Sequence, residues 1–307
     1  MSATAETPVL KGVTRIPNPQ EPVPAVAWPT VALLVGGLAL WGGSAAALLA
    51  VVWPWWVSAL VSAIASYLLF TVAHDASHHS TSSDRRLNTW IGRISTAFFA
   101  PHAAFPVWRF IHMQHHRFTN HHDGRDPDGY TMRGPKWQRP LRFLTIDLYY
   151  MVFYLPKLKS RPRAEKIELL TQWAIVGAIT AAAVATGYAF EILALYYLPC
   201  RLAVLFLGFA FDYLPHHGLH HRPSEDRLKT TRNRVGAERL LSPALLYQNY
   251  HLVHHLHPAV PFYRYLKVWR RNEEKYLAGD PALSTIGGRP LTVDEYRQLR
   301  ELVEHHH

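Results

Sequence analysis

Residues 31–79 read VALLVGGLALWGGSAAALLAVVWPWWVSALVSAIASYLLFTVAHDASHH, and they decide the fold class. This stretch holds no Asp, Glu, Lys or Arg before Asp75, and the charge-free run already begins at Pro22. A bilayer core needs about 20 apolar residues per helix, so the run predicts two membrane spans. The turn between them is expected at 53–56, because proline breaks helices and tryptophan favours the membrane interface.

Two further apolar runs lie in the second half of the chain. Leu169–Phe190 is uncharged, and Ile192–Phe211 is interrupted only by Arg201. We therefore expect an all-α integral membrane protein with four transmembrane helices in two hairpins, at about 29–50, 54–73, 169–188 and 192–213. Around them we expect a disordered Pro-rich arm (1–27), a membrane domain (28–278), a C-terminal cytosolic tail (279–304) and a purification-tag remnant (305–307).

The charged residues support this topology. The chain has 32 Lys and Arg against 22 Asp and Glu. Apart from Arg201, all Lys and Arg fall in residues 1–21, 80–168 and 213–304. The positive-inside rule then puts both termini and the 80–168 segment in the cytoplasm. The basic residues carry no nucleic-acid reader motif, so nucleic acid is excluded as a partner.

Histidine is the unusual residue of this chain, with 20 copies against a single cysteine. Outside the terminal three and His102, all histidines fall in the windows 74–79, 112–122, 216–221 and 251–257. His102 stands alone and is assigned no role. The four windows lie on the same predicted side of the membrane, in a helical cap. Histidines that are distant in sequence and share one side are what a common metal site requires. One cysteine excludes a disulfide scaffold and a Cys-ligated metal site.

Helical spacing selects the ligands within these windows. Residues i and i+4 share a helix face, so His74 and His78 can reach one metal ion. The H-x-x-H-H spacing occurs at 112–116 and again at 251–255, and we expect it to align three imidazoles on one stripe. Nine histidines exceed the needs of one ion, so we predict a dinuclear, histidine-rich metal site. Its ligands are His74, His78, His112, His115, His116, His216, His251, His254 and His255.

Several other residues are candidate ligands or outer hydrogen-bond partners of the ligands. They are His79, Asp212, His220, Asn249, Asp75, Asp126 and Asp128; for the last two, a plain Asp-Pro turn is the alternative. His121 and His122 are candidate outer groups, while His217 and His221 are given no role. Arg201 either extends to the far interface or lines the deep end of a substrate tunnel. Two stretches, 89–111 and 141–156, are either amphipathic interfacial helices or buried helices of the cap.

The three histidine boxes together resemble the signature of the membrane fatty acid desaturase and hydroxylase superfamily, over about residues 60–270. Within it, the phrases around the boxes look most similar to the β-carotene hydroxylase and ketolase branch. Those phrases are His74–His78, Asp126–Asp128, Tyr213–His216, Gln248–His251 and Pro258–Tyr265. His79 departs from that branch, which often has arginine there.

The resemblance implies an O2-dependent enzyme with two iron ions and an external reduced electron carrier, such as a ferredoxin-like protein. Zinc is expected to replace iron in overexpressed material, because imidazole sites accept both metals. The first function hypothesis is hydroxylation of an unactivated C–H bond of a lipid-soluble carotenoid. The alternative is an acyl-lipid or fatty acid desaturase or hydroxylase. A remote alternative is a non-enzymatic metal transporter, which would place its ligands near the bilayer midplane.

Overall fold

The computed structural model describes residues 16–305 and is dominated by helices. Four of the described helices are long and apolar enough to cross a membrane: Trp28–Leu49 (α1), Trp55–Ser77 (α2), Arg163–Ala185 (α6) and the composite Ala189–His216. These are the two predicted hairpins. Helix α2 continues to Ser77, beyond the predicted end at residue 73. The polar residues His74 and Asp75 can be part of it because they are buried against other parts of the protein and do not face lipid.

The fourth span is not one regular helix. Helices α7 (Ala189–Ile192), α8 (Leu198–Leu207) and α9 (Leu214–His216) are joined by π-helical turns at Leu193–Tyr197 and Gly208–Tyr213. Such turns are frequent at functional sites, and the second one carries Asp212. A Cβ at Gly208 would lie 2.8 Å from the carbonyl oxygen of Phe143, so glycine allows this close crossing.

Three helices fill the cap between the two hairpins: α3 (Arg85–Thr96), α4 (Phe105–Phe118) and α5 (Arg139–Tyr154). Helix α3 leaves Leu87, Trp90 and Ile94 exposed in one apolar row, as an interfacial helix does. Its connection to α4 is held against the spans, since the Phe98 carbonyl accepts a hydrogen bond from Ser66 Oγ at 2.8 Å. The 89–111 stretch therefore combines both predicted alternatives, with an exposed apolar face on α3 and a largely buried α4.

The C-terminal region folds onto the cap. It contains α10 (Glu238–Ala244), α11 (His251–Leu256), α12 (Tyr265–Leu277) and α13 (Val293–His305). Strand β1 (Asn233–Val235) pairs in parallel with β2 (Leu283–Thr285), which pairs antiparallel with β3 (Pro290–Leu291). The 279–304 segment, expected as a tail, thus supplies two strands and a helix, and its Tyr296 hydroxyl accepts a hydrogen bond from buried Trp269.

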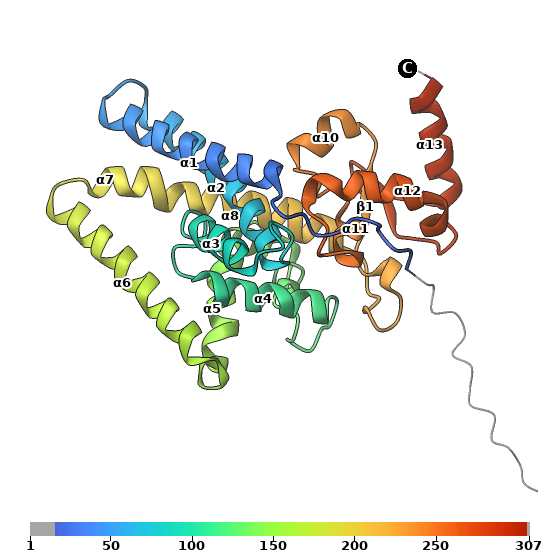
Figure 1. Cartoon of the computed structure of the whole chain (residues 1–307), viewed down its shortest axis with the longest axis horizontal. Helices are drawn as coiled ribbons and strands as arrows, with labels where there is room; N and C mark the ends of the chain where they lie inside the picture. The colour runs from blue at the N-terminus through green and yellow to red at the C-terminus, as the bar shows by residue number, and fades with distance from the viewer. Residues whose placement is uncertain (1–15, 306–307) are drawn as a thin grey trace, which may run out of the picture.

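The described part of the N-terminal arm is also held in place. The sequence predicts disorder over 1–27, but residues 16–27 form an extended strap along the folded body (Figure 1). The side chain of Glu21 is 5% exposed and forms ion pairs with Arg264, Lys267 and Arg271. A proline-rich segment has no periodic pattern that indicates a helix or a strand. The sequence therefore could not predict ion pairs with residues so distant along the chain. Residues 1–15 of the predicted arm lie outside the described residues.

Figure 1 shows the arrangement of the spans. Helices α1, α2 and α8 run side by side, and α6 diverges from them, joined to the fourth span by the far turn. Only 6% of the most apolar window of α6 is buried, against 56% for α2. The region from α10 to α13 lies at the opposite end, beside the ends of α2, α4 and α9. That end carries the histidines.

Candidate metal centre

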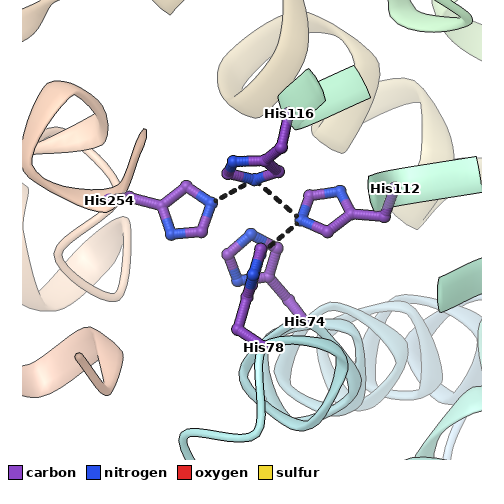
Figure 2. Close-up of side chains that lie close together, drawn as sticks. All are labelled: His74, His78, His112, His116 and His254. Carbon is purple, nitrogen blue, oxygen red and sulfur yellow. Dashed lines mark hydrogen bonds between the residues drawn. The ribbon is translucent and has the colours of Figure 1, made fainter. Parts of the chain in front are cut away.

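Five imidazoles converge from three helices to form site A. They come from α2 (His74) and its C-cap (His78), α4 (His112, His116) and α11 (His254), and their ligand atoms all lie within 4.8 Å of one another. Figure 2 shows the five rings facing a common point. The spacing explains the geometry, because each pair on α2 and α4 is separated by four residues and so lies on one helix face.

The distances within site A match a coordination shell. The Nε2 atom of His112 lies 2.8 Å from Nε2 of His78 and 3.2 Å from Nε2 of His116. The Nε2 atoms of His116 and His254 are 2.9 Å apart. With metal–nitrogen bonds of about 2.1 Å, two ligands at right angles are about 3.0 Å apart. The nitrogens therefore lie at the spacing that ligands around one ion would have.

Four more imidazoles form site B next to site A. They are His115 on α4, His216 on α9, and His251 and His255 on α11. The rings of His116 in site A and His255 in site B stack with centroids 4.2 Å apart, so the two sites are immediate neighbours. All nine predicted histidines thus fall into two sites.

The expectation that each H-x-x-H-H box aligns three imidazoles on one stripe is wrong. On α4, His112 and His116 belong to site A and His115 to site B, whereas on α11 the pair His251 and His255 belongs to site B and His254 to site A. A residue next to one of an i, i+4 pair is rotated by about 100° around the helix. Each box therefore divides its ligands between the two sites, because both helices pass between them.

Most of these imidazoles are held neutral. Burial lowers the pKa of His112, His116 and His254 well below the ordinary value for histidine, and nearby histidines lower it further. Burial acts in the same way on the pKa of His251 and His255. A neutral imidazole presents the lone pair that a metal ion needs.

His115 is the exception, because two carboxylates face it. Its Nδ1 lies 3.0 Å from Oδ1 of Asp126 and 3.5 Å from Oδ2 of Asp128. Burial lowers the pKa of His115, but Asp128 and Asp126 outweigh this effect and raise the pKa to about 9. The Nδ1–H group donates to Asp126, which leaves Nε2 free for a metal ion. Such carboxylate–histidine pairs orient metal ligands and increase their basicity.

Other ligands have neutral partners. Nδ1 of His254 lies 2.8 Å from the Tyr265 hydroxyl, and Nδ1 of His251 lies 3.2 Å from Oε1 of Gln248. The sequence pattern did not indicate Tyr265 and Gln248 as partners, nor Tyr150, which donates to Asp128 at 2.7 Å. Gln248 and Tyr265 lie in the two phrases, Gln248–His251 and Pro258–Tyr265, that carry the family resemblance. Their place in these phrases was the one feature of the sequence that could have indicated a role at the metal centre.

Unpartnered buried atoms at both sites fit metal ions. Nδ1 of His74 and both ring nitrogens of His216 are buried and lack a hydrogen-bond partner of normal geometry. The same holds for both carboxylate oxygens of Asp212, one turn before His216. Leaving a buried polar group unsatisfied costs about 1–3 kcal/mol, and more for a charged group. A cation at each site would satisfy one ring nitrogen each of His74 and His216, and an all-imidazole set suits iron, zinc, copper or nickel.

The remaining predicted site residues do not join either cluster. His79 contacts Asn88 and Arg109. Asp75 accepts hydrogen bonds from the Thr30 hydroxyl and the Phe262 backbone, so it ties α2 to α1 and to the C-terminal region. Asn249 donates to the Arg234 carbonyl, and His220 is exposed beside His122. Arg201 pairs with Asp147, so it does not extend to the far interface.

A narrow cavity of about 70 Å³ opens from the two sites toward the membrane interior. His74, His112, His115, His251, Asp128 and Asp212 line one part of it. Large apolar side chains form most of the wall: Phe70, Phe99, Trp108, Ile111, Leu207 and Phe211. His102, unassigned by sequence, and Asp147 also line it. The cavity would admit a slender apolar molecule beside the two histidine sites and would leave little room for water.

The known proteins to which this chain is similar are named as desaturases of fatty acids or acyl lipids. An omega-3 fatty acid desaturase (chloroplastic) of Brassica napus is 27% identical over 69% of this chain and 58% of its own length. An Arabidopsis thaliana sn-2 acyl-lipid omega-3 desaturase (ferredoxin) is 27% identical over 69% of this chain and 53% of its own. An Arthrospira platensis sn-1 oleoyl-lipid 12-desaturase is 34% identical over 40% of this chain and 34% of its own.

The chain spans about half the length of the curated relatives it matches. The model of the family described as fatty acid desaturase matches residues 50–287. This match covers most of the chain and includes every histidine of both sites, so the chain belongs to the fatty acid desaturase family.

Proposed function

We propose that this protein is an O2-dependent di-iron desaturase that acts on the acyl chains of membrane lipids. The observation that carries the proposal is the pair of adjacent histidine sites at one end of a narrow, apolar cavity. Three relatives bear acyl-lipid or fatty acid desaturase names, which supports the acyl alternative over carotenoid hydroxylation. The narrow cavity favours an unbranched chain over the bulky ring that ends a carotenoid.

Two irons bound at sites A and B would activate O2 to remove hydrogen from an unactivated C–H bond. Overall, the acyl chain of the lipid loses two hydrogen atoms. O2 combines with these two hydrogen atoms, two electrons and two protons to give two waters. The protein's residues hold the two sites and shape the cavity. Trp108 stacks on the ring of His112 at 5.1 Å, so the cavity wall also fixes a site A ligand.

We propose that the two electrons come from an external carrier, because a single cysteine, Cys200, cannot hold a Cys-ligated iron–sulfur cluster. We propose a ferredoxin-like donor, because the name of the Arabidopsis thaliana relative includes ferredoxin. The net charge of +10 favours electrostatic attraction of an acidic donor. We also propose that the metal-bearing end faces the cytoplasm, on the basis of the positive-inside rule.

Product analysis tests the proposal. The protein is expressed in cells that contain both β-carotene and monounsaturated phospholipids, together with a reduced ferredoxin system. We expect new double bonds in acyl chains and no oxygenated carotenoid, read by mass spectrometry, with a His116→Ala/His255→Ala double variant as the inactive control. Oxygenated carotenoids with unchanged acyl chains would overturn the acyl proposal and restore the carotenoid hypothesis.

A further inference from the structure

Three polar side chains meet where the inner cavity ends, and we call them the partition cluster: His102, Asp147 and Arg201. Nη1 of Arg201 donates to Oδ1 of Asp147 at 2.8 Å and to the Leu144 carbonyl at 3.0 Å. Nε2 of His102 lies 3.1 Å from the Asp147 carbonyl oxygen and 3.6 Å from its Oδ2. The ion pair between Arg201 and Asp147 compensates both charges where α5 meets the fourth span.

The partition cluster separates the inner cavity from a second, larger space. This outer groove has a volume of about 620 Å³, within the range of about 300–1,000 Å³ typical of ligand clefts. It lies between α6, which contributes Trp173, Gly177 and Thr180, and the fourth span, which contributes Tyr197 and Arg201. His102 lines both spaces, so this residue stands in the wall between them.

The outer groove is built for an apolar occupant from the bilayer. Helix α6 is exposed along most of its apolar length, and it diverges from the other spans (Figure 1). The polar groups of the groove satisfy one another: the Thr180 and Tyr197 hydroxyls are 2.6 Å apart, and Trp173 Nε1 donates to the His102 carbonyl at 2.8 Å. A polar ligand would have to break these bonds, whereas a hydrocarbon chain would not.

We propose that the outer groove is the access route of the substrate, by which a lipid chain passes sideways from the bilayer, past the partition cluster, to the metal centre. This inference rests on the proposed function and adds the route by which the substrate reaches the metal centre. The substrate is a lipid resident in the bilayer, not a water-soluble acyl thioester. Continuity carries the argument, because the groove meets the inner cavity at His102 and the inner cavity reaches the ligands of both sites.

A reversible block of the groove tests the route. A Cβ added at Gly177 meets no atom within 4 Å, so Gly177→Cys fits, and an alkyl group attached there would fill the groove. Cys200→Ala removes the natural thiol, and octyl methanethiosulfonate then adds the chain. The matched control is Gly43→Cys on α1, which is also exposed, equally free of contacts and outside the groove.

We expect octyl modification of Gly177→Cys to lower desaturation of oleoyl phosphatidylglycerol vesicles at least about tenfold. Dithiothreitol should restore the rate, the Gly43→Cys control should keep its rate, and all forms should retain two metal ions. If the parent protein makes no acyl product while retaining its metals, the proposed function fails. If the product forms and the octyl group leaves its rate unchanged, the access route is overturned.

Two further measurements separate substrate class from route. Oleoyl thioester in solution is offered beside the oleoyl vesicles, and a faster reaction with the thioester would overturn the bilayer-lipid assignment. His102→Ala removes the ring from the partition while leaving the ion pair of Arg201 and Asp147. We expect the chain then to slide, so that the products spread to neighbouring double-bond positions. An unchanged product distribution would remove His102 from the partition.

Discussion

Sites A and B are built from the same ligand type but in different surroundings. Site A is five imidazoles with the Arg109 guanidinium near His78, whereas site B has three buried carboxylates beside it, Asp126, Asp128 and Asp212. Burial lowers the pKa of His78, His112 and His116 in site A. In site B, the neighbouring carboxylates overcome burial and raise the pKa of His115 to about 9. The two sites have the same type of ligand, but a metal ion must displace a proton from His115 in site B and not from the site A imidazoles. The difference comes from the charged groups around each site.

The largest effect should come from removing one ligand of each site. His116 and His255 are a matched pair, because their rings stack but they belong to different sites. We expect His116→Ala and His255→Ala each to lower the metal content from two ions to about one. Turnover should fall more than about 100-fold, since removing only an outer partner already costs 10–100-fold. Metal analysis and product yield measure both, and an active variant with two ions would contradict the two-site assignment.

The outer partners should distinguish the two sites more finely. Asp126→Asn removes the charge that His115 Nδ1–H faces, so metal affinity at site B should fall about 10–100-fold. Tyr265→Phe removes only a neutral partner of His254, and a smaller loss, under about tenfold, is expected at site A. Competition with a chelator measures both affinities. Equal losses in the two variants would mean that the carboxylates do not distinguish site B.

Metal binding should release protons unequally. At pH 7, His115 of the metal-stripped protein is protonated, because its pKa is raised to about 9, and a metal ion must displace that proton. Site A imidazoles have a lowered pKa and have no proton to lose. We expect about one proton per ion at site B and almost none at site A at pH 7, with the release vanishing above about pH 9. Calorimetry in buffers of different ionisation enthalpy measures this, with His255→Ala isolating site A.

The smallest effect should come from a histidine outside both sites. His220 is exposed, and its ring lies 6.1 Å from that of His122. His220→Ala should leave metal content unchanged and turnover within a few-fold of the parent. A loss of one ion would place His220 in the metal centre, against the geometry.

The sequence predicted the spans and the nine histidines well, because both signals are local. Runs without charge specify lipid burial, and the spacing of four residues specifies a shared helix face. The sequence did not predict the N-terminal strap or the C-terminal strands. Glu21 is held by bases more than 240 residues away, and β1 pairs with a strand some 50 residues later. Neither contact leaves a periodic pattern.

By itself, the sequence determined that the chain spans a membrane four times and carries a histidine-rich centre for two metal ions. Only the tertiary structure decided how the ligands divide between the sites. His254 meets His116, 138 residues away, because α4 and α11 pass between the two sites. It also decided that Arg201 pairs with Asp147, at 54 residues' separation, in the wall of a cavity. Helical spacing fixes which residues share a face, whereas the packing of distant helices fixes what that face meets.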